Sequence, residues 1–415
     1  MGLMFVVLVS LTAWRAYSNL SPISRQFDWE NRAFSDFHNG TYLPTKAFVD
    51  GKSPYSAAVA YEYEMARETP PYSPIIFILH IPYALLPLEV SRALFFSSSI
   101  AVLGAIAFCC IKMSSLPFRW FDFFAITNLL LISRPGQQTI FTGYFTAEIV
   151  LGCFIALHFA AKRPMLSGLG LVLASVKPTF VLPLMMLMLF RRNFQSLVYG
   201  VLFCALAAGA GFGWLAMHNG VGNVVQDVAG GQEALHVDPT EMPVNTWTRT
   251  DLVGMYAKLT DWVPGDAVYL AVMVLAMSLL GVVLYKWTAD QQDDDGAAGL
   301  TGAVICLAIL LGIYHHAYDC LLLAVPLVGV ACSQRDSSFR VVPYFWRIVV
   351  AALIMVVGFN YLSTKSAMGL LQLEPLSNVW QGVTLINGLC IAIALVILVT
   401  CMVVQLAKGK VGSNS

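Results

Sequence analysis

A lysine stands inside apolar sequence at position 177. Lys177 lies in "ASVKPTFVLP", and a charge flanked in this way costs at least a few kcal/mol near the centre of a bilayer. It needs a partner. Pro178 breaks the helix there, so the lysine can end a helix beside an aqueous cavity and bind a phosphate. The alternative is a lysine that snorkels to the outer interface. As an isolated charge, Lys177 should be replaceable by Met without loss of folding.

Two histidines and an aspartate share one turn, in "LGIYHHAYDCLLL" at residues 311–323. His315 and Asp319 are four residues apart and so lie on one face of a helix that begins there. A zinc site would need a further ligand that the sequence does not identify. Hydrogen bonding of His315 and His316 to a phosphate, with Asp319 binding substrate, is therefore the favoured reading, and no metal or other cofactor is expected.

An acid follows the first apolar run in "FSDFHNGTYLPTKAFVDGKSPY", residues 34–55. Asp36 is close enough to that run to be held at the membrane surface. A carboxylate in this place can accept the proton of a hydroxyl while a lipid-linked substrate lies beside it in the outer leaflet. An ordinary turn acid in an exposed loop is the alternative.

Other polar residues are expected to face the same side of the membrane. Arg134, Gln137 and Gln138 lie in "SRPGQQTIFTGYF", and His236, Arg249 and Asp251 lie in the segment 218–265. Arg134 is expected to contact the same phosphate, and Gln137, Arg249 and Tyr55 to contact substrate. Glu148 and His158 lie within an apolar run and are expected to be satisfied internally.

These residues belong to a chain of 415 residues, 58% of them hydrophobic and 12% charged, with a mean hydropathy of +0.71. Such a composition indicates a polytopic membrane protein. The 24 basic and 24 acidic residues balance, which gives no reason to expect nucleic-acid binding. Nine cysteines fall in or beside apolar runs without CxxC spacing, as inert thiols do.

The apolar runs predict an all-α fold of about 12 transmembrane helices. The 165–190 run is too long for one span and contains Lys177-Pro178, so it is read as a hairpin or broken pair. Residues 1–20 are read as a retained first span and not as a signal peptide. The runs lie near 3–20, 92–111, 120–133, 144–161, 165–190, 196–217, 266–286, 298–313, 318–333, 347–362 and 383–406.

The basic loop residues orient these spans. If the proline-interrupted segment 73–90 does not cross the membrane, the short loops that carry Lys and Arg all fall on one side, which is then the cytoplasm. These loops hold Lys112 and Arg119, Lys162 and Arg163, Arg191 and Arg192, Lys286, Arg335 and Arg340, and Lys408 and Lys410. The segment 73–90 is therefore expected to be re-entrant or interfacial on the outer face. The long polar segments 21–73, 134–143, 218–265, 314–317 and 363–382 then lie outside, and "QQDDDG" at 291–296 is an inner turn.

One integral domain, 1–415, is therefore expected. Its first outer loop should carry surface helices, one of them starting at Ser53-Pro54 and ending at Pro70-Pro71. The parts are a first span at 1–20, the first outer loop at 21–90, spans at 91–217, an outer loop at 218–265, and C-terminal spans at 266–415.

Taken in order, four stretches resemble the polyprenol-phosphate-mannose-dependent mannosyltransferases of glycosyltransferase family 87, in the GT-C superclass. They are "SDFHNGTYLPTKAFVDGKSPY", "PPYSPIIFILHIPYALLP", "GQQTIFTGYF" and "GLGLVLASVKPTFVLPLMMLMLFRR". The resemblance implies transfer of one sugar, mannose, from a polyprenyl-phosphate donor to a lipid or glycan acceptor on the extracytoplasmic face of the plasma membrane. It also implies inversion and an acid of the first outer loop as general base, and Asp36 is the matching position.

Two other functions fit parts of the pattern. A transporter or flippase of a lipid-linked saccharide would also need a polar cavity, but the polar loops gather on one side and no internal repeat is visible. A non-catalytic assembly protein would tolerate the loss of Asp36.

Overall fold

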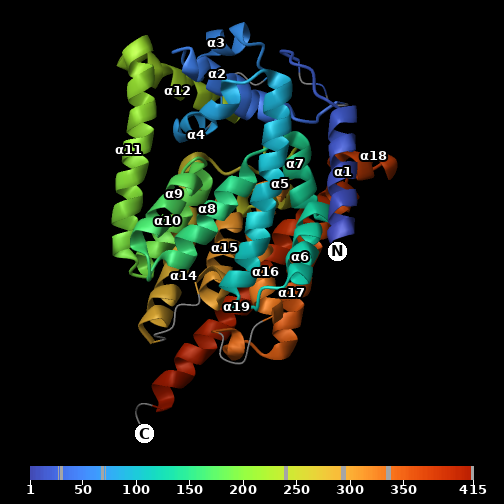
Figure 1. Ribbon diagram of the computed structural model, residues 1–415. Coiled ribbons are helices and arrows are strands. Elements are labelled where there is room, and N and C mark those ends of the chain that lie inside the picture. Colours follow the sequence, from blue (N-terminus) through green and yellow to red (C-terminus); the bar gives the residue numbers. More distant parts are fainter. Residues whose placement is uncertain are drawn as a thin grey trace.

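The computed structural model describes residues 1–26, 28, 31–66, 70, 72–237, 242–290, 296–332 and 338–412, without the side chains of 232–237, 266, 290 and 409–412. Helices dominate this part of the chain (Figure 1). Strand pairing within it is confined to two isolated bridges, Leu20 with Ala33 and Arg249 with His316. The predicted all-α class is confirmed.

Five helical segments are long and apolar enough to cross a membrane. They comprise α5 (Leu88–Met113), α11 (Phe194–Asn219), α14 (Asp266–Asp290), α17 (Tyr344–Phe359) with η5 (Tyr361–Ser363), and α19 (Asn378–Gly412). Eight apolar helices are shorter: α1 (Gly2–Ser18), α4 (Ile75–Ala84), α6 (Trp120–Ile132), α8 (Thr146–Phe159), α9 (Pro164–Ala174), α10 (Pro178–Phe190), α15 (Leu300–Gly312), and η3 (Ala317–Leu323) continued by α16 (Ala324–Cys332). These helices coincide with the apolar runs, and the protein is a polytopic membrane protein.

The 165–190 run is broken at Lys177, as predicted. Pro178 occupies the first turn of α10, and the residue before a proline is pushed out of the α region. Lys177 accordingly has extended backbone angles, φ −117° and ψ 107°. Lys177 is thus the N-cap of α10, and α9 ends just before it, at Ala174.

Helix α9 is seated between α8 and α11. Small residues permit this close approach: a Cβ on Gly170 would come within 2.6 Å of the Gly152 carbonyl oxygen, and one on Gly168 within 2.7 Å of Tyr199 Cβ. The packing fixes the Lys177 break relative to α8, which carries Thr146 and Glu148.

Helix α4 is too short to cross a bilayer. Its 10 residues extend about 15 Å, half of the hydrocarbon thickness. It packs against α2 (Leu43–Val49) and α11, and the Tyr42 hydroxyl donates to the Leu86 carbonyl at 3.0 Å just beyond it. This arrangement agrees with the re-entrant or interfacial role expected for 73–90.

Two local predictions were wrong. The surface helix α3 is only Ala57–Glu62 with Ser56 as its N-cap, because Tyr55 is held inside by a 2.8 Å hydrogen bond from its hydroxyl to the Tyr72 carbonyl. Pro71, the expected stop, lies outside the described residues. The expected loop 134–143 is helix α7 (Arg134–Thr142), which the Ser133 side chain caps by accepting from Gly136 N.

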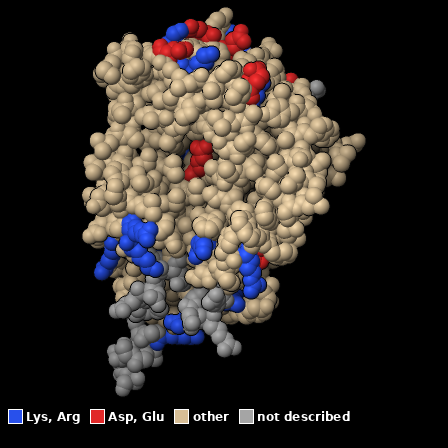
Figure 2. Space-filling view, in the orientation of Figure 1, with Lys and Arg blue, Asp and Glu red and all other residues tan. Residues whose placement is uncertain are grey.

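Charged residues separate along the bundle. We call the end that carries residues 31–66 and α12 (Val221–Val237) the loop end, and the end where α5 meets α6 and α19 finishes the basic end (Figure 1). Lys and Arg gather at the basic end, whereas acids and bases mix at the loop end (Figure 2). The distribution matches the predicted one-sided placement of the basic loops, although Arg335, the side chain of Lys410 and residues 291–295 lie outside the described part.

We predict that the loop end is extracytoplasmic. Ala58→Cys in α3 and Ala161→Cys in the α8–α9 turn place thiols at exposed positions of opposite ends. A charged, membrane-impermeant maleimide should label Ala58→Cys in intact cells and Ala161→Cys only after permeabilisation. The parent chain, with its nine native cysteines, is the background control. Labelling of Ala161→Cys alone in intact cells would invert the orientation.

Candidate functional site

A buried ion pair joins two parts of the chain that are far apart in sequence. Lys177 Nζ lies 2.8 Å from Asp319 Oδ2, with the lysine side chain 6% exposed and the aspartate fully buried. Lys177 is the N-cap of α10, and Asp319 is in the first turn of η3. The partner that the sequence required for Lys177 is thus Asp319, and the snorkelling alternative is wrong.

Asp319 accepts four hydrogen bonds. Besides Lys177, Oδ2 accepts from His315 Nδ1 at 3.0 Å and from the His316 backbone N–H at 3.0 Å, and Oδ1 accepts from the Thr146 hydroxyl at 3.3 Å. A carboxylate so surrounded by donors stays ionised in spite of its burial. It fixes η3, α8 and α10 to one another at a single point.

His315 adds charge to this cluster. Its second ring nitrogen, Nε2, lies 3.3 Å from the Thr179 carbonyl oxygen. A carbonyl and a carboxylate both accept, so the arrangement fits an imidazole that donates from both nitrogens, the protonated form. Lys177 and His315 then face one carboxylate, and one positive charge is left for an anionic ligand.

Aromatic rings enclose the lysine. Its Nζ lies 5.7 Å from the Tyr144 ring centroid, 5.4 Å from that of Phe180 and 5.3 Å from that of Tyr318. Such rings stabilise a cation while they keep water away from it. Tyr144 continues the wall by packing on Tyr318 at 4.6 Å and on Phe145 at 4.5 Å between ring centroids.

Asp36 belongs to a distorted helical turn at the loop end. It is half-buried and precedes a π-helical turn, η1 (Phe37–Tyr42), a conformation that often marks functional positions. Phe34 N donates to the Phe141 carbonyl at 2.8 Å, and the Phe37 ring packs on Phe95 at 4.5 Å. The carboxylate of Asp36 acts electrostatically on Tyr318, so both are at the same end of the bundle.

The segment 248–251 is hydrogen-bonded to His315 and His316. Arg249 donates to Asp251 at 2.8 and 2.7 Å, and the Thr250 backbone N–H donates to the His315 carbonyl at 2.9 Å. Burial alone would raise the pKa of Asp251, but the charge and hydrogen bonds of Arg249 lower it to about 2. Asp251 also caps α13 (Leu252–Thr260). His316 Nδ1 in turn lies 2.5 Å from the Thr248 hydroxyl.

The structure therefore gathers Lys177, His315, His316 and Asp319, with Arg249 beside them in its pair with Asp251, and the turn that carries Asp36 lies at the same end of the bundle. It does not gather three other predicted residues. The Tyr55 hydroxyl is hydrogen-bonded to the Tyr72 carbonyl, as described. The Arg134 guanidinium is bound to the Asn360 carbonyl at 3.2 Å and to Ser363, which makes it a tie between α7 and η5.

Gln137 is also structural. Its amide nitrogen donates to the Leu131 carbonyl at 2.6 Å and to Thr12 at 3.3 Å, and its oxygen accepts from Arg15 at 3.1 Å. It joins α1 to the α6–α7 corner. A side chain whose donor and acceptor atoms are bonded to protein partners is not available to bind substrate. The side chain of His236 lies outside the described residues.

Sequence reasoning missed His80. Its Nε2 lies 3.2 Å from Glu148 Oε2, so Glu148 has an internal partner for one of its two carboxylate oxygens. The signal was present, since a histidine in the apolar stretch "IIFILHIPYA" and a glutamate in another apolar run each need a polar partner.

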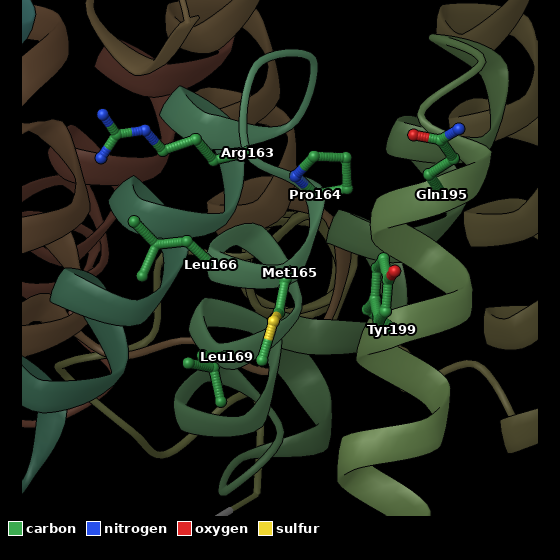
Figure 3. Close-up of a pocket in the computed structure, with 7 residues that line it drawn as sticks. All are labelled: Arg163, Pro164, Met165, Leu166, Leu169, Gln195 and Tyr199. Atoms are coloured by element: carbon green, nitrogen blue, oxygen red, sulfur yellow. The ribbon is translucent and has the colours of Figure 1, made fainter.

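A groove of about 540 Å³ lies at the basic end, between α9 and α11. Figure 3 shows Gln195 and Tyr199 on one helix opposite the residues from Arg163 to Leu169. Arg163 is its single charged lining residue, and none of the predicted site residues lines it. Acid–base chemistry is therefore better placed at the loop end.

Fold and site together define a polytopic membrane protein with a charged cluster under its loop end. A match to the family model of glycosyltransferase family 87 covers residues 71–311, more than half of the chain, and the chain belongs to that family. It is a glycosyltransferase, an enzyme that transfers a sugar from a donor to an acceptor. No curated protein and no solved structure matched the chain.

The matched range contains Lys177 and Arg249 but begins after Asp36 and ends before His315. Family membership therefore supports transfer of a sugar over transport, and the resemblance that the sequence suggested is confirmed at the level of the family. The roles of the individual side chains depend on the geometry.

We predict that Lys177→Met destabilises the protein, contrary to the expectation for an isolated charge. Removing Lys177 takes one charge and one hydrogen-bond donor from the buried Asp319 and leaves only His315 to balance it, and breaking a buried pair costs about 3–5 kcal/mol in the free energy of unfolding. Thermal unfolding in detergent measures the loss. The double variant Lys177→Met/Asp319→Asn should recover much of it. An unfolding temperature of Lys177→Met equal to that of the parent would show that the pair does not form.

Proposed function

We propose that this glycosyltransferase moves a hexose, mannose by its family resemblance, from a polyprenyl-phosphate donor to a lipid or glycan acceptor. The observation that carries the proposal is the juxtaposition at the loop end. There, the half-buried acid Asp36 lies at the same end of the bundle as the cluster Lys177–Asp319–His315, which has a surplus positive charge and whose lysine contacts the Tyr318 ring. An inverting transfer needs these two parts, a base on one side of the sugar and a phosphate site on the other.

The phosphate site would consist of Lys177 and His315. When the bond between the anomeric carbon and the phosphate oxygen breaks, negative charge grows on the departing polyprenyl phosphate. A surplus cation inside an aromatic wall matches that charge more strongly than it could in water. Asp319 holds both cations in place and keeps the ligand-free site from carrying two uncompensated charges. His316 completes the cluster through its backbone N–H on Asp319.

Asp36 would act as the general base. The acceptor hydroxyl attacks the anomeric carbon from the face opposite the phosphate, and its proton passes to the Asp36 carboxylate as the new bond forms. One displacement inverts the anomeric centre. A β-linked mannosyl donor would therefore give an α-mannoside, which the family resemblance also implies. Arg249 and Asp251 would contribute by holding the segment 248–251 over the histidines.

The extracytoplasmic face of the plasma membrane is the proposed place of reaction. Basic side chains gather at the opposite end of the bundle (Figure 2), and such loops stay in the cytoplasm. The long apolar helices would let the donor lipid remain in the outer leaflet while its phosphate reaches Lys177. Neither a metal nor another cofactor takes part in this scheme.

We predict that Asp36→Asn lowers turnover by a factor on the order of 10² or more, because the amide keeps the size of the acid but cannot take a proton. Donor binding should be nearly unchanged. The assay is sugar transfer by purified protein. Asp50→Asn is the matched control, since Asp50 is an exposed acid of the same loop that bonds the Tyr63 hydroxyl. Parental turnover in Asp36→Asn would move the base to another carboxylate.

We further predict that His315→Gln weakens binding of polyprenyl phosphate about tenfold or more, as loss of a charge-assisted hydrogen bond does. Native mass spectrometry or a fluorescence titration in detergent measures the dissociation constant. His218→Gln changes another loop-end histidine, which contacts the Trp214 carbonyl at 2.8 Å, and should bind like the parent. Equal affinities for parent and His315→Gln would remove His315 from the phosphate site.

A further inference from the structure

A histidine–glutamate pair lies near the cluster and has no part in the scheme above. His80 of α4 is 2% exposed at its side chain and Glu148 of α8 is 27% exposed, with Nε2 and Oε2 3.2 Å apart. His80 Nδ1 lies 2.7 Å from the Ile76 carbonyl oxygen, which can only accept, so Nδ1 donates. One proton is therefore shared between Nε2 and Oε2, whichever of the two atoms holds it.

Only one of the two carboxylate oxygens is used in this way. Within the described part of the chain, Glu148 Oε1 has no hydrogen bond from a protein group, and the residue keeps a quarter of its surface open. An acid in an apolar helix is costly unless water or a ligand reaches it. With its side chain 27% exposed, the Glu148 carboxylate is available to a polar ligand.

Aromatic rings link the pair both to the turn of Asp36 and to the wall around Lys177. On one side, Tyr83 and Phe95 pack on the His80 ring at 5.6 and 6.4 Å, and both rings also contact Phe37, the neighbour of Asp36. On the other side, Phe145 packs on His80 at 6.2 Å and stacks on Tyr144, which faces Lys177.

Helix α8 couples the pair to the cluster. Thr146 in its first turn donates to Asp319, while Glu148, two residues later and so on another side of the helix, reaches His80. Phe145 is the N-cap of α8 and Tyr144 precedes it, so both rings lie at the end of the helix that carries Glu148. In an in-line displacement the transferred sugar lies between the base and the departing phosphate, and aromatic contacts link Glu148 and His80 to the proposed positions of both.

We propose that Glu148, held by His80, binds hydroxyl groups of the transferred hexose and selects among hexose epimers. This inference rests on the proposed function. A carboxylate oxygen accepts hydroxyl hydrogens well, and aromatic rings such as Phe145 and Tyr144 pack against the apolar face of a sugar. His80 is a positioning residue, because it orients the carboxylate and does not itself face the ligand.

The test separates sugar recognition from recognition of the lipid phosphate. Dissociation constants of polyprenyl phosphate, with no sugar and with mannose, glucose or galactose attached, are measured for the parent, Glu148→Gln and the exposed control Glu89→Gln. Transfer rates are measured with the same donors. The amide of Glu148→Gln can still hydrogen-bond to His80, and thermal unfolding checks that the variant is folded.

We expect one hexose to strengthen binding to the parent over the sugar-free lipid. Glu148→Gln should lose that gain by roughly tenfold and transfer the epimers at more equal rates, while its affinity for the sugar-free lipid and all properties of Glu89→Gln stay parental. A Glu148→Gln variant that keeps the gain and the epimer preference would overturn the inference.

Failure of the proposed function has a different signature. If the parent binds sugar-linked donors more tightly than polyprenyl phosphate but transfers no sugar, the transfer reaction is wrong and the binding difference still decides the role of Glu148. If the parent binds none of these lipids, the proposed donor class is wrong and the assignment of Glu148 falls with it.

Discussion

The contact between Lys177 and Asp319 is the interaction on which the rest of the site depends. Neither charge could be kept in so apolar a place alone, and together they fix the position of three elements, because Asp319 also accepts from His315 and Thr146. The break in the 165–190 run places the lysine at this contact. Once the pair is made, His315 joins the same carboxylate, and the proposed phosphate site depends on this arrangement.

A glycosyltransferase that uses a lipid phosphate has two electrostatic tasks on opposite sides of one carbon atom. Charge must be matched where the phosphate departs, and a proton must be taken where the hydroxyl attacks. In the proposed scheme the charged cluster would perform the first task and Asp36 the second. Aromatic rings pack beside both, around Lys177 and against Phe37, the neighbour of Asp36. The proposed role of Glu148 would add a polar contact to the sugar among these apolar rings.

Much of the fold could be predicted because membrane insertion leaves a local record in the sequence. Apolar runs predicted the helices, and Pro178 predicted the break in the 165–190 run. The spacing of four residues pointed to His315 and Asp319 as neighbours, but they do not share a helical face, because η3 begins only at Ala317. Partners could not be predicted in this way. Only the tertiary structure decides which polar groups meet. It brings Lys177 to Asp319, 142 residues further along the chain, and it uses Arg134 and Gln137 to hold helices together. The pairing of His80 with Glu148 was missed for the same reason, because the two residues belong to different helices.

The most direct test of the account is the product of a transfer reaction. Purified protein is incubated with polyprenyl-phosphate mannose and a membrane lipid extract, and the lipids are analysed by mass spectrometry and by the anomeric proton signals of the new sugar. The account predicts one new glycolipid that is a single hexose heavier than its acceptor and carries an α-linkage from a β-linked donor. A β-linked product would contradict the single inverting displacement, and no product from a donor that binds the protein would contradict sugar transfer from polyprenyl-phosphate mannose.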